Sequence, residues 1–508
     1  MSKTLFQSVL IIAGFSILTR FLGFLFRIYL SRELGAELLG VYQVAFSVFM
    51  VLIVIVSSGI PLAVSKSIAK YRVEGNTAKS GSMVASALVV GLAVAVALCG
   101  ILLLFYKYIG AMFADCRCIY ILISLLPAVI CSAVYSAFRG ALWGAQDYFN
   151  VSLAELIEQV LRIMVFALMA EWIFSSLDGA LVAGISMSVA CVLSAIFVAI
   201  VYFSKGNRLS SPRESYRTMI KSAAPVTGVR VASSLIQPII AVLFPAMLVL
   251  AGYTSEQAME SYGMAMGMTF PLLFLPSTIV GALSFALIPD LSTAIAQKND
   301  KLVSTRITTS LSFALFISAL IIPFYIGCGE AIGVFLYDNI SSGIYLTRSA
   351  WVMIPLGLSN ITSSILNAFN LEVKSFVNNI LGGAILLIFV VAFSGLLGVD
   401  SLILGFGACM TITTVLNLFM LKKHTKLNFS LLKPLFLMIL FMIPASLLAK
   451  WVYGVMLLCM PKVVALMLAA VAGVGSFTVL CWLFRLVDIT SVLVKINFKK
   501  HKKTVNSA

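Results

Sequence analysis

Charged residues are scarce in this chain. Asp, Glu, Lys and Arg make up 11% of its 508 residues, while hydrophobic residues make up 61%. A water-soluble globular protein carries about 25% charged and 45–50% apolar residues, so this composition excludes a soluble enzyme, with or without a membrane anchor. Since one helical span uses about 20 residues, the apolar residues suffice for about 14 spans, with little left for extramembrane domains. We predict an all-α polytopic membrane protein.

Histidine is also scarce. The chain has two, His424 and His501, and both lie in basic stretches. Because structural and catalytic metal centres commonly use histidine ligands, we predict no metal site. The nine cysteines lie mostly in apolar runs, and four of them, Cys116, Cys118, Cys328 and Cys459, lie near predicted outer ends. This pattern allows a disulfide at the outer face but does not assign one.

Apolar runs and their polar interruptions predict fourteen spans. The first six are 5–30, 39–60, 82–105, 119–138, 153–173 and 179–203. The next six are 222–250, 263–288, 308–327, 346–369, 375–395 and 399–420. Two more follow at 431–449 and 463–484.

Most of the 35 Lys and Arg residues lie in loops that follow even-numbered spans and in the C-terminal tail. The positive-inside rule then places both termini in the cytoplasm of a plasma membrane. We interpret the net charge of +16 as a record of topology rather than of nucleic-acid binding. The basic tail would also attract anionic membrane lipids. The first apolar run is long, contains two arginines and lacks a convincing cleavage site, so we expect it to be retained.

A weak internal repeat links the two halves. Pro61 and Pro127, which lie at the end of span 2 and the start of span 4, match Pro289 and Pro355 at a shared offset. The match predicts two lobes of parallel topology with a cleft between them that opens alternately to each side. We therefore divide the chain into four segments: 1–210 with spans 1–6, 211–426 with spans 7–12, 427–490 with spans 13–14, and a basic cytoplasmic tail at 491–508.

Arginines within the first span are the main candidates for ligand contact. An ionisable side chain at the bilayer centre costs about 2.5–3.5 kcal/mol on insertion scales, so it normally faces a cavity or a partner. Arg20 and Arg27 are seven residues apart, so both leave the same helix face with a rise of about 10 Å between them. Gly23 lies between them and leaves room for a bulky group. Snorkelling to the head groups is the alternative, and it suits Arg27 better than Arg20.

Further charges lie in spans 5 and 7. Glu155, Glu158 and Arg162 share a helix face, and their spacing fits either a structural ion pair or a gate that a ligand opens. Arg230 stands unpaired in a stretch broken by three prolines, which predicts a bent helix. Together, the candidate residues of spans 1, 5 and 7 are four arginines and two glutamates, so we predict an anionic ligand. The planar guanidinium fork favours a phosphate, and a diphosphate fits best.

Two sequence patterns resemble a known family. Span 1 reads R-x-x-G-F-x-x-R at Arg20–Arg27, and the segment after it reads L-G-A-E at Leu34–Glu37. The residues that follow span 4 read R-G-x-x-x-G at Arg139–Gly144, and span 5 reads E-x-I-E-Q-x-x-R at Glu155–Arg162. Over essentially its whole length the chain resembles the polysaccharide-transporter branch of the MOP superfamily, and especially the group of stage V sporulation protein B and the MurJ-like lipid II flippases.

The resemblance implies a fold of two six-helix lobes in a MATE-like V shape, with two extra C-terminal helices. It implies a sugar chain on undecaprenyl diphosphate as the substrate, and it places Arg20 and Arg27 in the transport cavity. It also implies a Gram-positive plasma membrane and a role in sporulation or peptidoglycan synthesis. Relatives often carry a carboxylate in span 7, and this chain has none between Arg230 and Pro245, which puts ion coupling by that helix in doubt.

The sequence thus predicts a non-enzymatic transporter, a flippase that moves a lipid-linked saccharide to the outer leaflet. Arg20, Arg27 and Arg230 would bind the substrate, and Glu155, Glu158 and Arg162 would form the gate or ion pair. No cofactor is predicted, and a coupling proton, a sodium ion, the membrane potential and cell-wall synthesis partners stay open. A multidrug cation antiporter is the alternative, although its ligands favour an acidic cavity. A glycan polymerase or ligase, or a recruiting scaffold, fits the short outer loops and the buried arginines less well.

Overall fold

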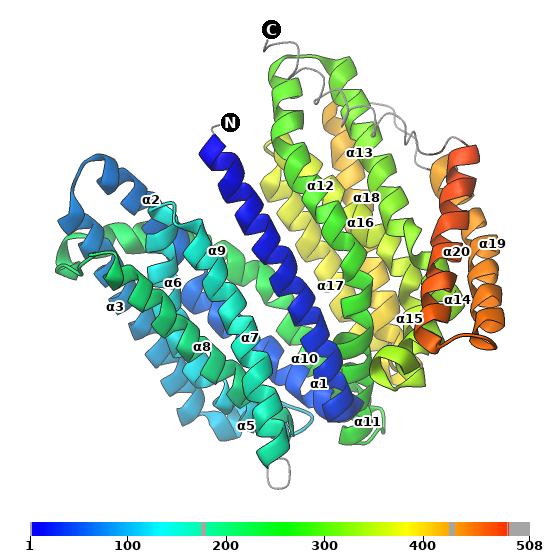
Figure 1. The fold of residues 1–508 in the computed structure, drawn as a ribbon, viewed down its shortest axis with the longest axis horizontal. Coiled ribbons are helices and arrows are strands. Elements are labelled where there is room, and N and C mark those ends of the chain that lie inside the picture. The colour runs from blue at the N-terminus through cyan, green and yellow to red at the C-terminus, as the bar shows by residue number, and fades with distance from the viewer. Residues whose placement is uncertain (1–2, 174–178, 426–431, 485, 487–508) are drawn as a thin grey trace. The chain divides into compact units, whose positions relative to one another are not determined.

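Nearly every described residue is helical, and no strand occurs in residues 3–173, 179–425, 432–484 and 486, which the computed structural model describes (Figure 1). Long helices are expected here because lipid offers no hydrogen-bond partner to an open backbone. The all-α prediction is confirmed. The predicted basic tail at 491–508 lies outside the described residues.

Contacts divide the chain into two compact units. The first contains Met1–Met268 and Ser394–Gly398, and the second contains Thr269–Phe393 and Val399–Ala508. The predicted boundary between the two lobes, between residues 210 and 211, stays a prediction.

The first unit holds eleven α-helices and a short 3-10 turn. They are α1 (Lys3–Ser57), α2 (Ile60–Val73), α3 (Thr77–Leu104), α4 (Tyr106–Gly110), α5 (Arg117–Ser124), α6 (Leu126–Gly144), α7 (Tyr148–Ile173), α8 (Gly179–Ser204), η1 (Pro212–Glu214), α9 (Tyr216–Ser234), α10 (Ile236–Leu250) and α11 (Ser255–Tyr262). A π-helical segment, η2 (Gly263–Thr269), follows α11 and reaches the boundary between the units.

Nine α-helices follow, and they belong to the second unit except for the last residues of α17 from Ser394 onwards. They are α12 (Phe270–Ala296), α13 (Asp300–Leu320), α14 (Ile322–Tyr337), α15 (Ile340–Ser349), α16 (Met353–Ala368), α17 (Glu372–Leu397), α18 (Asp400–Thr425), α19 (Leu432–Leu457) and α20 (Lys462–Leu483). A 3-10 turn, η3 (Ala350–Val352), precedes α16.

Twelve helical segments of the described chain are long and apolar enough to cross a membrane. One of them, Gly14–Val73, has 60 residues, which at 1.5 Å per residue exceeds the hydrocarbon core about threefold, so it accounts for more than one pass. Helix α7 is not among the twelve, because its acidic and basic residues exceed the charge allowed in an apolar span. When Gly14–Val73 is counted as two passes and α7 is added as one, the twelve segments give the fourteen predicted spans.

Gly35 interrupts the long first helix. Its φ of 69° and ψ of 179° are non-helical, so α1 consists of two helices joined at a kink. A positive φ strains residues that have a Cβ, which explains a glycine at this point. The kink lies between the predicted spans 1 and 2, where the sequence analysis left a gap at 31–38.

The predicted bend in span 7 occurs at Leu235, where α9 ends and α10 begins. Pro225 lies inside α9 without ending it, whereas Pro238 lies in the first turn of α10. The break precedes Pro238 because proline lacks the N–H of an interior helical residue and clashes with the turn before it.

Helix packing in one unit recurs in the other. In the first unit α6 packs on α2, α3 and α8, and in the second α16 packs on α12, α13 and α18. The recurrence supports the predicted internal repeat. Its prolines match less closely, since Pro61 and Pro127 begin α2 and α6 whereas Pro289 lies inside α12.

Candidate functional site

The arginine stripe lies on the N-terminal half of α1. Arg20 is exposed and Arg27 is half-buried. A Cβ on Gly23, between them, would lie 3.8 Å from Nε2 of Gln159 on α7, which is ordinary contact distance. Helix α1 therefore presents its stripe beside α7, the helix that carries Glu155, Glu158 and Arg162.

Two ion pairs connect the charges of α7. Arg162 Nη2 lies 3.2 Å from Glu158 Oε1, one helical turn away, and their side chains are 18% and 22% exposed. This pair confirms the interaction that the spacing predicted. Glu155 pairs instead with Arg139 of α6, whose Nη2 lies 2.5 Å from Glu155 Oε1. Glu155, Glu158 and Arg162 thus take part in two separate contacts.

Arg139 was missed as a membrane charge. The predicted fourth span ended at Phe138, whereas α6 continues to Gly144 and includes Arg139. Its guanidinium carbon lies 4.4 Å from the ring centroid of Trp143 and 5.8 Å from that of Tyr135. Cation–π contacts of this kind hold an arginine in place while its fork binds a carboxylate.

The glycines of the R-G-x-x-x-G pattern allow α2 and α6 to approach closely. A Cβ on Gly140 would come within 2.9 Å of the Pro61 Cα atom, and a Cβ on Gly144 within 2.7 Å of the Ser65 carbonyl oxygen. Small residues at helix crossings permit such approach in membranes. The pattern therefore combines a packing role for its glycines with an electrostatic role for its arginine.

Polar contacts outside the predicted spans hold the turn between α6 and α7. Lys205 forms an ion pair with Asp147, and Asn150 Nδ2 donates to Asp147 Oδ2 at 2.8 Å. Burial raises the pKa of the Asp147 carboxyl, but the hydrogen bonds from Lys205 and Asn150 outweigh burial, so the pKa is lowered overall. A lowered folded-state pKa stabilises the turn above the unfolded pKa, and this stabilisation is lost as the pH falls through the folded value.

Arg230 lies at a different junction. It is exposed on α9, and its Nη1 donates to the Ser58 carbonyl at 3.3 Å, between α1 and α2. This backbone hydrogen bond gives Arg230 a partner that the sequence did not indicate. A Cβ on Gly59 would lie 2.3 Å from the Ala223 carbonyl oxygen, so α9 packs tightly on this break. The freed carbonyl at the helix end attracts the guanidinium.

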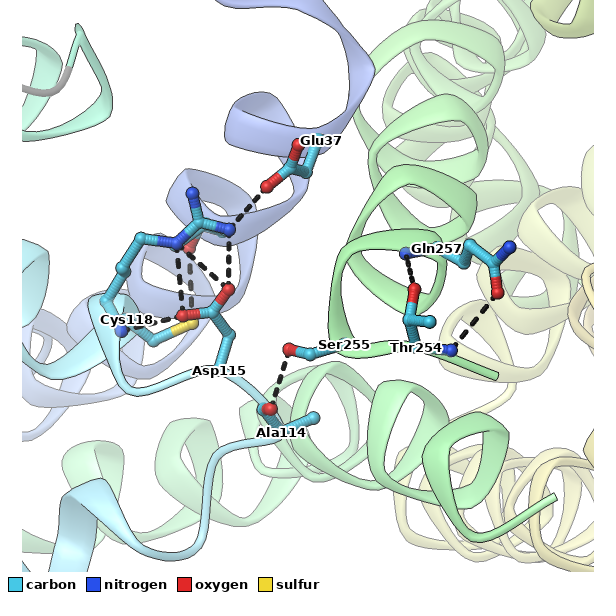
Figure 2. A network of polar contacts seen from close by, with 9 residues as sticks. Glu37, Ala114, Asp115, Cys118, Thr254, Ser255 and Gln257 are labelled. Carbon is cyan, nitrogen blue, oxygen red and sulfur yellow. Dashed lines mark hydrogen bonds and ion pairs between the residues drawn. The ribbon is translucent and has the colours of Figure 1, made fainter. Parts of the chain in front are cut away.

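A second polar network joins α1, α5 and α11 (Figure 2). Arg117 bridges Glu37 and Asp115, with Nη2 at 2.7 Å from Asp115 Oδ2. Ser255 Oγ donates to the Ala114 carbonyl at 2.8 Å, beside the capping box that Thr254 and Gln257 form at the start of α11. We call this group the α1–α5–α11 junction.

The backbones at this junction are unusually close. A Cβ on Gly40 would lie 1.9 Å from the Met259 carbonyl oxygen, and a Cβ on Gly263 would lie 1.9 Å from the Ala36 carbonyl oxygen. Only glycine fits at either position without movement of the helices. These glycines have no local signal in the sequence, because a contact between distant segments leaves no local pattern.

The cysteines do not form disulfides. All nine are free, and of the four near the predicted outer ends, Cys116 and Cys459 are exposed. Cys118 Sγ donates to the Val41 carbonyl and Cys328 Sγ to the Ala449 carbonyl. Cys118 and Cys328 are buried, so they serve as packing residues.

The Arg139–Glu155 pair predicts a stability effect. Arg139→Ala leaves a half-buried carboxylate without its partner, which costs about 1–3 kcal/mol. We expect a lower unfolding midpoint in detergent, and a smaller loss in Arg139→Ala/Glu155→Ala, which removes both charges. A double variant that is less stable than Arg139→Ala would contradict this assignment.

Comparison with known structures defines the class of protein. A lipid II flippase MurJ in an inward closed conformation aligns with a TM-score of 0.72 and 14% identity, over 94% of this chain and 98% of that one. An inward-facing MATE family multidrug resistance transporter of the MOP superfamily aligns with a TM-score of 0.66 and 16% identity, over 80% and 94%. The chain is a polytopic helical membrane protein with the fold of these transporters.

Sequence comparison shows the family. The model of the polysaccharide biosynthesis protein family matches residues 5–295, which is more than half of the chain, and the chain belongs to that family. It is 24% identical over 430 residues to stage V sporulation protein B of Bacillus subtilis (strain 168), covering 82% of this chain and 83% of that protein. It is also 24% identical over 475 residues to lipid II flippase MurJ of the same organism, covering 85% of each.

Proposed function

We propose that the protein is a flippase that moves an undecaprenyl-diphosphate-linked saccharide from the inner to the outer leaflet of a bacterial plasma membrane by alternating access. The observation that carries the proposal is the Arg20–Arg27 stripe on α1, beside the ion pairs of α7. The similarity to a lipid II flippase and membership of a polysaccharide biosynthesis family support it.

The charge balance favours an anionic ligand. The candidate site residues of the predicted spans are four arginines, Arg20, Arg27, Arg162 and Arg230, and two glutamates, Glu155 and Glu158, and α6 adds Arg139. Adding Arg139 to the sequence-based count raises the excess to three positive charges. A diphosphate balances most of this excess, and its oxygens match the planar fork of arginine.

The ion pairs supply a switch. A carboxylate held by an arginine in one state is released when a phosphate draws that arginine away, so ligand binding and helix movement become coupled. Glu158 with Arg162, next to the stripe, is the pair on which we place this role. Arg139 with Glu155 keeps α6 and α7 together throughout the cycle.

An apolar groove in the second unit suits a polyprenyl tail. It has a volume of about 760 Å³ and runs between α19 and the helices α14, α16 and α18. Its walls include Trp351, Ile354, Val415, Leu435 and Ile439. A chain of isoprene units has no polar group to satisfy, so contact with such walls stabilises it by hydrophobic burial. We propose that the lipid tail lies here.

Narrowing the groove tests this placement. Val415→Trp fills space on the α18 wall, so we expect weaker transport of a full-length undecaprenyl substrate and little change for a short-tailed analogue. The measurement is the ratio of flipping rates for the two lipids. Leu404→Trp, on the same helix but not a lining residue, is the matched control. An unchanged ratio in Val415→Trp would remove the tail from this groove.

A multidrug antiporter is the second candidate, because the MATE transporter shares the fold. Cationic drugs are attracted by carboxylates, and the excess of arginine opposes them. For the flippase, a proton, a sodium ion or the membrane potential would drive the cycle. Both termini would be cytoplasmic, the basic loops would contact anionic lipids, and cell-wall synthesis proteins would supply and use the saccharide.

Depletion in the cell tests the proposed function. Loss of the protein should cause one lipid-linked saccharide to accumulate in the inner leaflet, and mass spectrometry of extracted lipids would identify it. This result would also show whether the saccharide serves peptidoglycan synthesis, spore formation or another glycan. Normal levels of every undecaprenyl-linked intermediate after depletion would contradict the proposal.

A further inference from the structure

Helices α1 and α7 run side by side in the same direction. Three contacts fix their register: Phe15 with Phe149, Gly23 with Gln159, and Phe26 with Phe166. The residue numbers of these contacts rise together along both helices, which sets the parallel direction. These contacts identify the residue of α7 that lies beside the arginine stripe of α1.

Gln159 lies level with the middle of the stripe. Gly23, which it faces, follows Arg20 by three residues and precedes Arg27 by four, so all three share one face of α1. The amide nitrogen lies 3.8 Å from the position of a Cβ on Gly23, and its carbonyl oxygen 3.9 Å. The amide is thus seated against the one position between the arginines that has no side chain.

Several buried polar atoms of these two helices have no hydrogen-bond partner among the described residues. They are Thr19 Oγ1, Gln159 Nε2 and Arg162 Nε. Gln159 is 6% exposed as a whole. Buried donors are nearly always satisfied in folded proteins, because an unsatisfied one is destabilising. Donors without acceptors on two adjoining helices indicate that an acceptor-rich group binds between them.

We infer that the Gln159 side-chain amide, between Arg20 and Arg27, is a third and uncharged donor to the diphosphate of the substrate. The inference rests on the proposed function. Two guanidinium groups balance the two charges of a diphosphate diester, and a third cation would slow its release. An amide adds a directional hydrogen bond without adding charge, which suits a site that must bind and release in each cycle.

Gln159→Leu separates this role from a structural one. Undecaprenyl diphosphate is the probe, and undecaprenol, which lacks phosphate, is the control lipid for the purified full-length protein. A hydrogen bond to a charged group predicts about tenfold weaker binding of the diphosphate and unchanged binding of undecaprenol. Because the amide nitrogen has no partner among the described residues, the unfolding midpoint should stay the same or rise. A structural role predicts the opposite result, a lower midpoint with unchanged affinity.

Gln159→Glu adds an electrostatic test with nearly the same shape. At neutral pH a carboxylate at this position would repel the phosphate, so we expect weaker binding than in Gln159→Leu. Lowering the pH should recover affinity relative to the wild type over the same range, because a protonated carboxyl is uncharged and donates a hydrogen bond. Gly23→Ala, which covers the amide, should reproduce the effect of Gln159→Leu. Gly14→Ala, on the same helix with open space around it, is the matched control.

The outcomes distinguish this inference from the proposed function. Wild-type affinity in Gln159→Leu, together with loss of binding in Arg20→Ala/Arg27→Ala, would overturn the role of Gln159 and leave the flippase proposal intact. Full binding in the double arginine variant would overturn the diphosphate site itself. A lower unfolding midpoint with unchanged affinity would assign Gln159 to packing.

Discussion

Arg20→Ala/Arg27→Ala should reduce flipping of an undecaprenyl-diphosphate-linked saccharide at least about 100-fold. A hydrogen bond to a charged group contributes about 1.5–3 kcal/mol, and 1.4 kcal/mol corresponds to a factor of ten, so each arginine accounts for about one to two powers of ten. Arg20 is exposed, so its loss should not unfold the protein. The measurement is the initial flipping rate in proteoliposomes at matched protein levels.

Two controls make this result specific. Arg20→Lys/Arg27→Lys keeps both charges but loses the planar fork, so it should recover only part of the rate. Arg208→Ala removes one positive charge from an exposed position between α8 and η1 and should flip normally. Equal losses in Arg208→Ala and in the double alanine variant would mean that overall charge, and not the stripe, sets the rate.

Cross-linking the α1–α5–α11 junction should arrest transport. Ser255 and Ala114 are joined by a hydrogen bond at 2.8 Å, and we propose that this junction must open in every cycle. In a background with Cys116→Ser and Cys459→Ser, which removes the two exposed cysteines, Ala114→Cys/Ser255→Cys should stop flipping on oxidation. A reductant should restore the rate. The readout is flipping before and after oxidation of the same sample.

A second cysteine pair serves as the matched control. Ser188 Oγ donates to the Ser124 carbonyl at 2.6 Å, between α8 and α5, and these helices should move together. Oxidised Ser124→Cys/Ser188→Cys should therefore flip at the unoxidised rate. If the oxidised Ala114→Cys/Ser255→Cys protein also flips normally, the junction stays closed during transport, and the gate must lie elsewhere.

Features with a local sequence signal could be predicted. Long apolar runs gave the all-helical membrane fold, since lipid leaves few other backbone structures. The i,i+4 spacing gave the Glu158–Arg162 pair, because one helical turn brings those side chains together. The prolines indicated a break in span 7, which occurs at Leu235. Each of these depends on residues close together in the chain.

Features that depend on distant segments could not be predicted. Arg139 was left outside its span, because apolar runs do not define a helix end to within a few residues. The partner of Glu155 was therefore unknown, and the carbonyl contact of Arg230 was missed. Gly40 and Gly263 gave no signal, since their role comes from the backbone of another helix. Gln159 stood in a family pattern, but only the packing of α7 on α1 placed it against Gly23.

The most direct test is a flipping assay with purified protein in liposomes that carry a fluorescent undecaprenyl-diphosphate-linked disaccharide. The account predicts that the protein accelerates transfer of this lipid between leaflets, that a lipid of equal length without phosphate is not accelerated, and that a cationic dye is not transported. Transport of the dye without acceleration of the diphosphate lipid would contradict the account and favour a drug antiporter.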